Sequence, residues 1–171
     1  MGTSLKENIC KDELFNELFK AHSKDLFNFL YYKYGADNNP HDIVQEAYIK
    51  LWKNCEKVIY AKARAFLFTV GNNQMLSELA KKKTALKFAE TKPKAYSLET
   101  PEFVMQEKEY GDRLEAALAE LTEEQRVAFL LNRIEGKKHQ EIAEILGISR
   151  KAVEKRIYTA LAKLRKKVEE L

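Results

Sequence analysis

The sequence predicts an all-α protein made of two small helical domains joined by a flexible linker. Apolar residues recur at helical spacing along most of the 171 residues. Only 6 Gly and 3 Pro interrupt the chain, which favours long helices over β-structure with many turns. Residues 85–110 lose the helical spacing and contain two of the prolines, which is typical of a linker. We therefore expect domains at residues 11–84 and 111–171.

The N-terminal domain is predicted to contain long helices at about residues 11–34, 40–53 and 63–83. The first of these is one helix or two, with a break near His22 and Ser23, and Gly35 suits its C-terminal cap. Asn39 and Pro40 are typical of an N-cap and the first residue of a helix.

The C-terminal domain is predicted to begin its first helix near Asp112, where the helical spacing resumes. Asp112 with Glu115, and Thr122 with Gln125, each resemble a capping box ahead of an apolar run. Three or four short helices are expected between there and the end of the sequence.

The charge is unevenly distributed along the chain. Residues 1–50 carry −2, residues 51–94 carry +7, residues 95–130 carry −6 and residues 131–171 carry +5. Two basic segments separated by an acidic one are what two contacts with a polyanion require, although solvated helix faces give the same pattern.

Several classes of protein and site are disfavoured by the residues that the sequence lacks. Cys10 and Cys55 have no CxxC spacing, so reduced thiols in the cytosol are expected, and Cys55 is expected to be buried and inert. Neither a signal peptide nor a membrane span is visible. The three histidines, His22, His41 and His139, have no ligand spacing, so no metal or other cofactor is expected. No nucleophile elbow or phosphate-binding loop is present, which argues against an enzyme and a small-molecule substrate.

The strongest local pattern lies in residues 139–157. Ala143 provides the small residue that two crossing helices need, Gly147 provides the positive φ of a tight turn, and Ser149 can cap the helix that follows. The apolar residues of the shared face are Ile142, Leu146, Ile148, Val153 and Ile157. The second helix exposes Arg150, Lys151, Glu154, Lys155 and Arg156. These offsets predict a DNA-binding helix-turn-helix; an ordinary helical hairpin with a basic outer face is the alternative.

The whole chain, from about residue 12 to 168, resembles one family. The segment at residues 121–166, LTEEQRVAFLLNRIEGKKHQEIAEILGISRKAVEKRIYTALAKLRK, is similar to the C-terminal domain of extracytoplasmic-function (ECF) sigma factors of the sigma-70 class, which reads the −35 promoter element. By itself it is also similar to LuxR-type regulators. The N-terminal half decides for the sigma factors, because residues 42–52, DIVQEAYIKLW, resemble their polymerase-binding segment and residues 64–83, RAFLFTVGNNQMLSELAKKK, their −10-binding helix.

The resemblance implies a set of binding residues. Core RNA polymerase is expected to contact Asp42, Gln45, Glu46 and Ile49. The −10 element is expected to contact Lys57, Val58, Lys62, Arg64, Asn73, Ser77, Lys81, Lys82 and Lys83. The −35 element is expected to contact Ser149, Arg150, Lys151, Lys155 and Arg156, with Lys166 and Lys167 holding phosphate. The resemblance also implies control by an anti-sigma factor, commonly membrane-anchored.

Some positions depart from the family pattern. Lys138 stands where a Ser or Thr cap is frequent, and Glu154 and Thr159 stand at positions of the recognition helix that are often basic. Gly71 and Asn72 replace Ala and a basic residue, and Ser77 and Glu78 replace an Asp-Tyr pair. These differences affect the expected promoter sequence and leave the expected architecture unchanged.

A helical wheel gives an independent prediction for residues 42–53. Val44, Ala47, Tyr48 and Leu51 fall on one side, and Asp42, Gln45, Glu46, Ile49 and Lys53 fall on the other. An apolar residue ringed by polar ones is typical of a partner surface, although a single exposed Ile is also ordinary.

The predicted function is that of a cytoplasmic sigma factor that binds core RNA polymerase and promoter DNA and has no catalytic site. The first alternative is a helix-turn-helix regulator of the LuxR type that acts without being a polymerase subunit. The second is an enzyme acting on nucleic acid, which the absence of a catalytic constellation disfavours.

Overall fold

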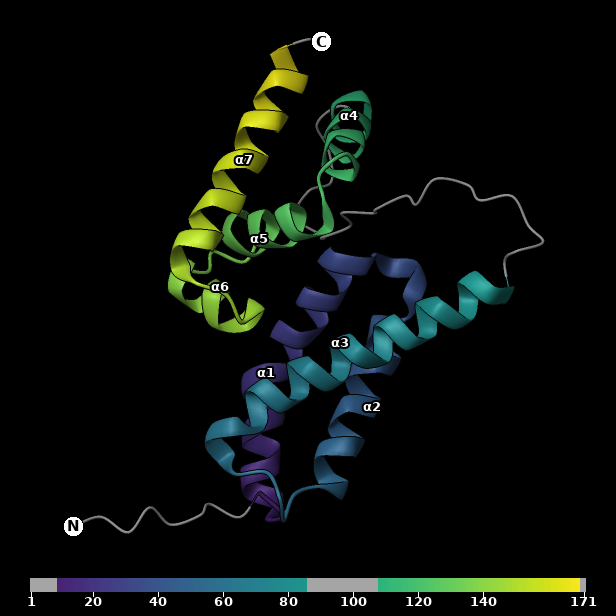
Figure 1. The fold of residues 1–171 in the computed structure, drawn as a ribbon, viewed down its shortest axis with the longest axis vertical. Helices are drawn as coiled ribbons and strands as arrows, with labels where there is room; N and C mark the ends of the chain where they lie inside the picture. The colour runs from purple at the N-terminus through teal and green to yellow at the C-terminus, as the bar shows by residue number, and fades with distance from the viewer. Residues whose placement is uncertain (1–8, 86–107, 170–171) are drawn as a thin grey trace. The chain divides into compact units, whose positions relative to one another are not determined.

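The computed structural model describes residues 9–85 and 108–169, and within these ranges all regular elements are helices (Figure 1). The all-α prediction is therefore confirmed. The elements in chain order are α1 (Asp12–Tyr34), the short 3-10 helix η1 (Ala36–Asn38), α2 (Pro40–Lys53), α3 (Tyr60–Ala85), α4 (Lys108–Ala119), α5 (Glu123–Arg133), α6 (His139–Leu146) and α7 (Arg150–Glu169). The chain divides into two compact units, residues 1–30 with 37–90 and residues 31–36 with 91–171.

Most of the predicted linker, residues 86–107, lies outside the described residues. Its last three residues belong to α4, which begins at Lys108, so the helix starts before the expected Asp112. Asp112 therefore lies inside the helix and cannot be its N-cap. The prediction of a capping box with Glu115 is wrong because the residues before Asp112 also take helical geometry.

The core of the first unit is formed by α1, α2 and α3. The helix α1 runs unbroken through His22 and Ser23, which settles whether this segment forms one helix or two. The apolar side chains that these helices bury include Leu18, Leu26, Leu30, Leu51, Leu67 and Met75. The Tyr48 hydroxyl donates to the Leu18 carbonyl over 3.1 Å and thereby fixes α2 against α1. Figure 1 shows α3 running across this pair of helices.

Close packing explains why a glycine lies in the middle of α3. Gly71 is buried, and a Cβ built on it would lie 3.1 Å from Cδ1 of Leu26 on α1. A methyl group there would force Leu26 to move by a few tenths of an ångström. Glycine thus lets α3 approach α1 closely.

The turn between α1 and α2 depends on two residues with left-handed backbone geometry. Gly35 has a φ of 86° and its N–H donates to the Tyr31 carbonyl, so the predicted C-terminal cap is confirmed. Asn39 precedes Pro40, as predicted, but its φ is 48° and its side chain makes no capping hydrogen bond. The side-chain cap expected at Asn39 is therefore wrong. Asparagine suits this position because it tolerates the left-handed region better than most residues.

A disulfide joins Cys10 to Cys55, with 5.1 Å between the two Cα atoms. The expectation of two reduced thiols, with Cys55 buried and inert, is therefore wrong. Both residues are half-buried. Sequence spacing gave no signal because the cysteines are 45 residues apart. Only the folding of α1 and α2 brings Cys10, two residues before α1, beside the loop that follows α2.

The second unit contains the helix-turn-helix and its supporting helices α4 and α5. At the start of α5, Gln125 N–H donates to Thr122 Oγ1 over 3.2 Å and Thr122 N–H donates to Gln125 Oε1 over 3.4 Å. This is the predicted capping box. The helix α7 packs along α5 and α6, and Val127, Leu131, Ile142 and Val153 are among the fully buried residues. Within the described ranges, no helix is both long enough and apolar enough to cross a membrane.

Candidate nucleic-acid and partner interfaces

The turn between α6 and α7 has the geometry of a helix-turn-helix. Gly147 has a φ of 65°, and Ile148 N–H donates to the Ala143 carbonyl over 3.0 Å. Ala143 is buried where the two helices meet. The Ser149 hydroxyl accepts from Ala152 N–H over 3.2 Å and caps α7. Ala143, Gly147 and Ser149 therefore have the structural roles that their positions in the sequence predict.

The start of α6 shows how the helix forms without a Ser or Thr cap. Lys138 N–H donates to the Glu141 carboxylate over 2.7 Å, which is the reciprocal half of a capping box. The other half is not possible because a lysine side chain has no acceptor. The departure at Lys138 therefore leaves the start of α6 supported by Glu141.

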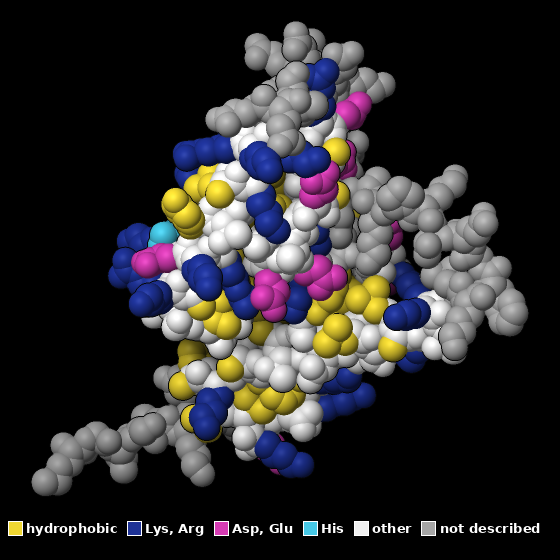
Figure 2. Space-filling model, turned by 45° about the horizontal axis from the view of Figure 1, so that its top comes forward, with side chains coloured by type: hydrophobic (Ala, Val, Ile, Leu, Met, Phe, Trp, Pro, Cys, Tyr) yellow, Lys and Arg dark blue, Asp and Glu magenta, His cyan; other side chains and the backbone are white. Residues whose placement is uncertain are grey.

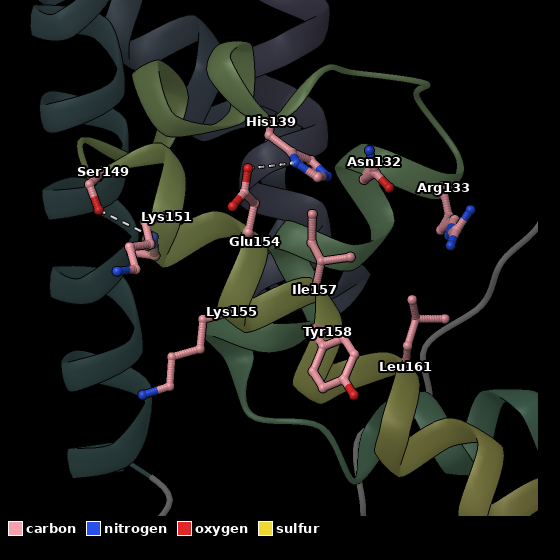
Figure 3. Close-up of a pocket in the computed structure, with 11 residues that line it drawn as sticks. Asn132, Arg133, His139, Ser149, Lys151, Glu154, Lys155, Ile157, Tyr158 and Leu161 are labelled. Atoms are coloured by element: carbon pink, nitrogen blue, oxygen red, sulfur yellow. Dashed lines mark hydrogen bonds and ion pairs between the residues drawn. The ribbon is translucent and has the colours of Figure 1, made fainter.

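The exposed side of α7 is a stripe of four residues, which we call the reading stripe: Lys151, Glu154, Lys155 and Tyr158. Their spacing of three, four and seven residues places them on one face of the helix. Tyr158 is 77% exposed, the largest value among the exposed large hydrophobic residues of the described ranges. In Figure 3, Lys151 and Lys155 extend from α7 toward the same side.

The predicted −35 residues do not all lie on this stripe. Arg156 is on a different side of α7, where its guanidinium pairs with Glu124 of α5 over 2.9 Å and its side chain is only 25% exposed. Lys167 pairs with Glu120, the residue that follows α4, over 2.9 Å. Arg150 is exposed and donates to Glu154 over 3.0 Å. Lys166 is exposed near the end of α7.

A shallow depression of about 820 Å³ adjoins the reading stripe. Residues from α5, α6, α7 and the turn line it (Figure 3), namely Asn132, Arg133, His139, Ser149, Lys151, Ala152, Glu154, Lys155, Ile157, Tyr158 and Leu161. His139 Nδ1 lies 3.6 Å from the Glu154 carboxylate. Figure 2 shows Lys and Arg side chains gathered over this unit, with acidic and histidine side chains among them.

The first unit presents a second candidate surface on α2. Asp42, Gln45, Glu46 and Ile49 are all exposed, and Ile49 is 53% exposed. The opposite side of the helix, with Val44, Ala47, Tyr48 and Leu51, is buried. Both halves of the helical-wheel prediction are confirmed. We call the four exposed residues the α2 face.

Further exposed apolar groups lie near the C-terminal half of α2. Trp52 is 42% exposed and its ring contacts Phe15 edge-on at 5.0 Å between centroids. Phe19 is 47% exposed and its ring lies 4.9 Å from that of Tyr48. Trp52 lies three residues after Ile49 and so adds apolar surface next to the α2 face, a composition typical of a protein-binding surface.

The second half of α3 carries five of the predicted −10 residues, Asn73, Ser77, Lys81, Lys82 and Lys83. Asn73, Ser77 and Lys81 are exposed and follow one another at intervals of four residues, so they share a face. Lys81 donates to Glu78 over 2.9 Å, and this hydrogen bond raises the pKa of Lys81. Lys82 donates to the Asp37 carbonyl and to Asn38 Oδ1. Lys83 is exposed at the end of the basic run.

The loop between α2 and α3 is held in a tight turn by its own backbone. Lys57 and Val58 both donate to the Asn54 carbonyl, at 2.9 and 3.0 Å. Lys57 is exposed and Val58 is half-buried. Within α3, Lys62 is exposed, whereas Arg64 is half-buried with its guanidinium 5.9 Å from the centre of the Phe68 ring. Arg64 is thus partly committed to packing within the unit.

Sequence reasoning did not select three residues of the depression, His139, Glu154 and Tyr158, as binding residues. The signal for Glu154 and Tyr158 was present, because both follow Lys151 at helical intervals. His139 could not be found in this way, since only the crossing of α6 over α7 brings it to Glu154.

Models of known protein families match both units. The family model for sigma-70 region 2 matches residues 18–84, and the model for sigma-70 region 4 matches residues 111–164. Together they span most of the chain. The region 2 match contains the α2 face and the exposed face of α3. The region 4 match contains the helix-turn-helix.

Among curated proteins, the chain is 28% identical over 164 residues to the ECF RNA polymerase sigma factor SigL of Mycobacterium tuberculosis, covering 92% of this chain and 90% of SigL. It is 25% identical over 155 residues to the ECF RNA polymerase sigma factor SigE of Mycolicibacterium smegmatis. That alignment covers 88% of this chain, which spans 60% of the length of SigE.

Solved structures share the fold. The sigma factor RpoE, in complex with the anti-sigma factor NepR from Bartonella quintana, aligns with a TM-score of 0.65 and 18% identity, covering 91% of this chain and 96% of that one. CnrH, in complex with the cytosolic domain of CnrY, aligns with a TM-score of 0.59 and 23% identity, covering 94% and 90%. With regions 2 and 4 both matched in order, the chain belongs to the sigma-70 family, in its ECF group.

Proposed function

We propose that this protein is a sigma factor that binds core RNA polymerase and directs it to specific promoters. The observation that carries the proposal is that one chain contains both a region 2 unit with an exposed α2 face and a region 4 unit with a helix-turn-helix. A regulator that binds DNA alone needs only the second of these.

The proposed polymerase contact is the α2 face. Ile49 would be desolvated at its centre while Asp42, Gln45 and Glu46 supply charged and polar groups at its rim. Such a rim steers association and selects the partner, and the apolar centre contributes most of the affinity. A basic surface on the polymerase is the complement that two carboxylates require.

The proposed −10 contact is made by the loop between α2 and α3 and by the exposed face of α3. Reading a base in a melted strand requires an unstacked base, which costs a few kcal/mol. Asn73 would pair with the edge of the extruded base, and Ser77 lies one turn further along the same face. Lys57, Val58, Lys62 and Arg64 would line the strand near the loop, while Lys81, Lys82 and Lys83 would hold its phosphates.

The proposed −35 contact is made by the helix-turn-helix. The capped start of α7, at Ser149, would enter the major groove with Arg150, Lys151 and Lys155. Arg156, Lys166 and Lys167 would act on the phosphates at its edge. For Arg156 and Lys167 this requires exchanging a carboxylate partner, Glu124 or Glu120, for a phosphate.

In this proposal the chain is not an enzyme, because the polymerase supplies the catalytic site. It would act in the cytoplasm, where polymerase and promoter DNA meet. An anti-sigma factor is a further proposed partner, supported by the likeness to RpoE, whose solved structure is a complex with the anti-sigma factor NepR.

Co-purification tests the proposal against its rivals. The tagged full chain is mixed with core RNA polymerase, without DNA, and passed over a size-exclusion column. A sigma factor elutes with the polymerase in equimolar amount. A LuxR-type regulator, or an enzyme acting on nucleic acid, elutes separately, and that result would exclude the proposal.

A further inference from the structure

The reading stripe contains one residue whose charge is opposite to that expected of a DNA-binding surface. Glu154 lies between Lys151 and Lys155, on the exposed side of α7, with its side chain 44% exposed. A carboxylate facing DNA is repelled by the phosphates, so it weakens binding unless it makes a specific contact. Its position therefore requires an explanation.

Two side chains, Arg150 and His139, lie against the Glu154 carboxylate. Arg150 Nε donates to its Oε1 over 3.0 Å from one turn earlier on α7. His139 Nδ1, at the start of α6, approaches the same oxygen to 3.6 Å (Figure 3). The side chain is thus restrained from two helices, and a restrained side chain loses less conformational entropy when it binds.

The chemistry of the major groove limits what a carboxylate can contact there. An ionised carboxylate only accepts hydrogen bonds, and the only donors on base edges in this groove are the N4 amino group of cytosine and the N6 amino group of adenine. Of the two, cytosine pairs with Glu or Asp, whereas adenine is read by the amide of Asn or Gln through a donor and an acceptor together.

We infer that Glu154 is a specificity-determining residue of the −35 contact, which selects a cytosine in the base pair facing the middle of the reading stripe. His139 is a positioning residue because it acts through the carboxylate, and Arg150 positions the same carboxylate in addition to its proposed contact in the groove. The inference rests on the proposed function, since it requires α7 to enter the −35 duplex.

The experiment uses holoenzyme assembled from core polymerase and the full chain. Its template is a promoter that this holoenzyme transcribes, with the −35 region randomised and the −10 region kept. Bound templates are selected and sequenced for the wild type, Glu154→Ala and Glu154→Gln. The matched control is Glu144→Gln. Glu144 is an exposed residue of α6 that lies outside the depression and accepts a hydrogen bond from Gln140. Circular dichroism verifies that each variant keeps its helices.

The wild type is expected to prefer cytosine at one position by about tenfold, the discrimination typical of one good contact to a base edge. Glu154→Ala flattens that position and leaves the others unchanged. Glu154→Gln moves the preference there toward adenine. Glu144→Gln selects the same sequences as the wild type.

Two results would overturn the inference, and they are distinguishable. If the wild type selects a −35 sequence and Glu154→Ala selects the same one with uniformly higher affinity, Glu154 only adds repulsion and the inference alone fails. If wild-type holoenzyme selects no −35 sequence at all, the proposed −35 contact fails and the inference falls with it.

Discussion

At the scale of single residues, Asn73 gives a direct test of strand capture. It is exposed in the middle of α3, on the face shared with Ser77 and Lys81. Asn73→Ala should leave polymerase binding and the closed complex intact but reduce the open complex, because the extruded base loses its hydrogen-bond partner. Permanganate reactivity of promoter thymines measures the open complex.

The matched control for this variant is Asn16→Ala, an exposed asparagine of α1. It removes the same amide from a helix that has no proposed role at the −10 element. Equal thymine reactivity in the wild type and Asn73→Ala would show that Asn73 does not capture the melted strand.

His22 predicts how the stability of the first unit depends on pH. Its pKa is lowered from its ordinary value, mainly by burial and secondly by the positive charge of Arg64, with Asp25 opposing. The folded state therefore disfavours the protonated imidazole. The unfolded chain binds more protons below its own pKa of about 6.5, so the free energy of unfolding should fall as the pH drops through that value.

Urea unfolding at pH 7.5 and 5.5 measures this effect through the fluorescence of Trp52, the single tryptophan of the chain, which lies in the first unit. His22→Gln should lose less stability between the two pH values than the wild type. If the wild type and His22→Gln lose the same stability between the two pH values, titratable groups other than His22 cause the pH dependence.

At the scale of elements, the α2 face predicts a defect in polymerase binding that leaves the fold intact. Asp42→Lys combined with Glu46→Lys should weaken binding to core polymerase several-fold or more, because reversed charges repel a basic partner. Both residues are exposed, so the helix content should not change. Titration of fluorescently labelled protein with core polymerase gives the affinity.

The matched control reverses two carboxylates with the same spacing on another helix, Glu13→Lys with Glu17→Lys on α1. If this control and the α2 variant weaken binding equally, net charge rather than the α2 face governs the affinity. If the α2 variant binds core polymerase with unchanged affinity, the α2 face does not contact the polymerase.

The disulfide between Cys10 and Cys55 predicts that the first unit is less stable under reducing conditions. The two cysteines are separated by 45 residues in the sequence. For a loop of this length the loss of chain entropy in the unfolded state stabilises the folded state by about 4 kcal/mol. Dithiothreitol should lower the urea midpoint of the wild type. The double variant Cys10→Ser, Cys55→Ser should start at the reduced midpoint and not respond to the reductant; a wild type that also fails to respond would contradict the prediction.

The elements also show which parts of the fold could be predicted from sequence. The α2 helix, its buried side and the turn at Gly147 were predictable because helical periodicity and positive φ are local properties of the chain. The capping box at Thr122 was predictable for the same reason, since its partner is only three residues away.

Contacts between distant segments were not predictable in this way. The disulfide joins residues 10 and 55, and the pairs Arg156–Glu124 and Glu154–His139 each join two helices. A sequence pattern cannot show them because they depend on how helices cross. The prediction of an N-cap at Asn39 was wrong for a different reason. Asparagine suits this position because its backbone tolerates the left-handed conformation of the turn, whereas its side chain makes no capping hydrogen bond.

At the scale of the whole molecule, the two units carry different parts of one task. The basic residues between 51 and 84 belong to the unit that would hold the melted −10 strand, and those between 131 and 169 to the unit that would hold the −35 duplex. Neither unit alone can fix both the position and the opening of a promoter. The proposed function therefore requires that the chain works as a subunit of RNA polymerase.

Transcription from genomic fragments tests this claim most directly. Core polymerase is incubated with the fragments with and without the protein, and the 5′ ends of the transcripts are sequenced. We expect new start sites that appear only with the protein and share sequence elements near −35 and −10. Identical start sites in both reactions, with the protein bound to DNA on its own, would contradict it.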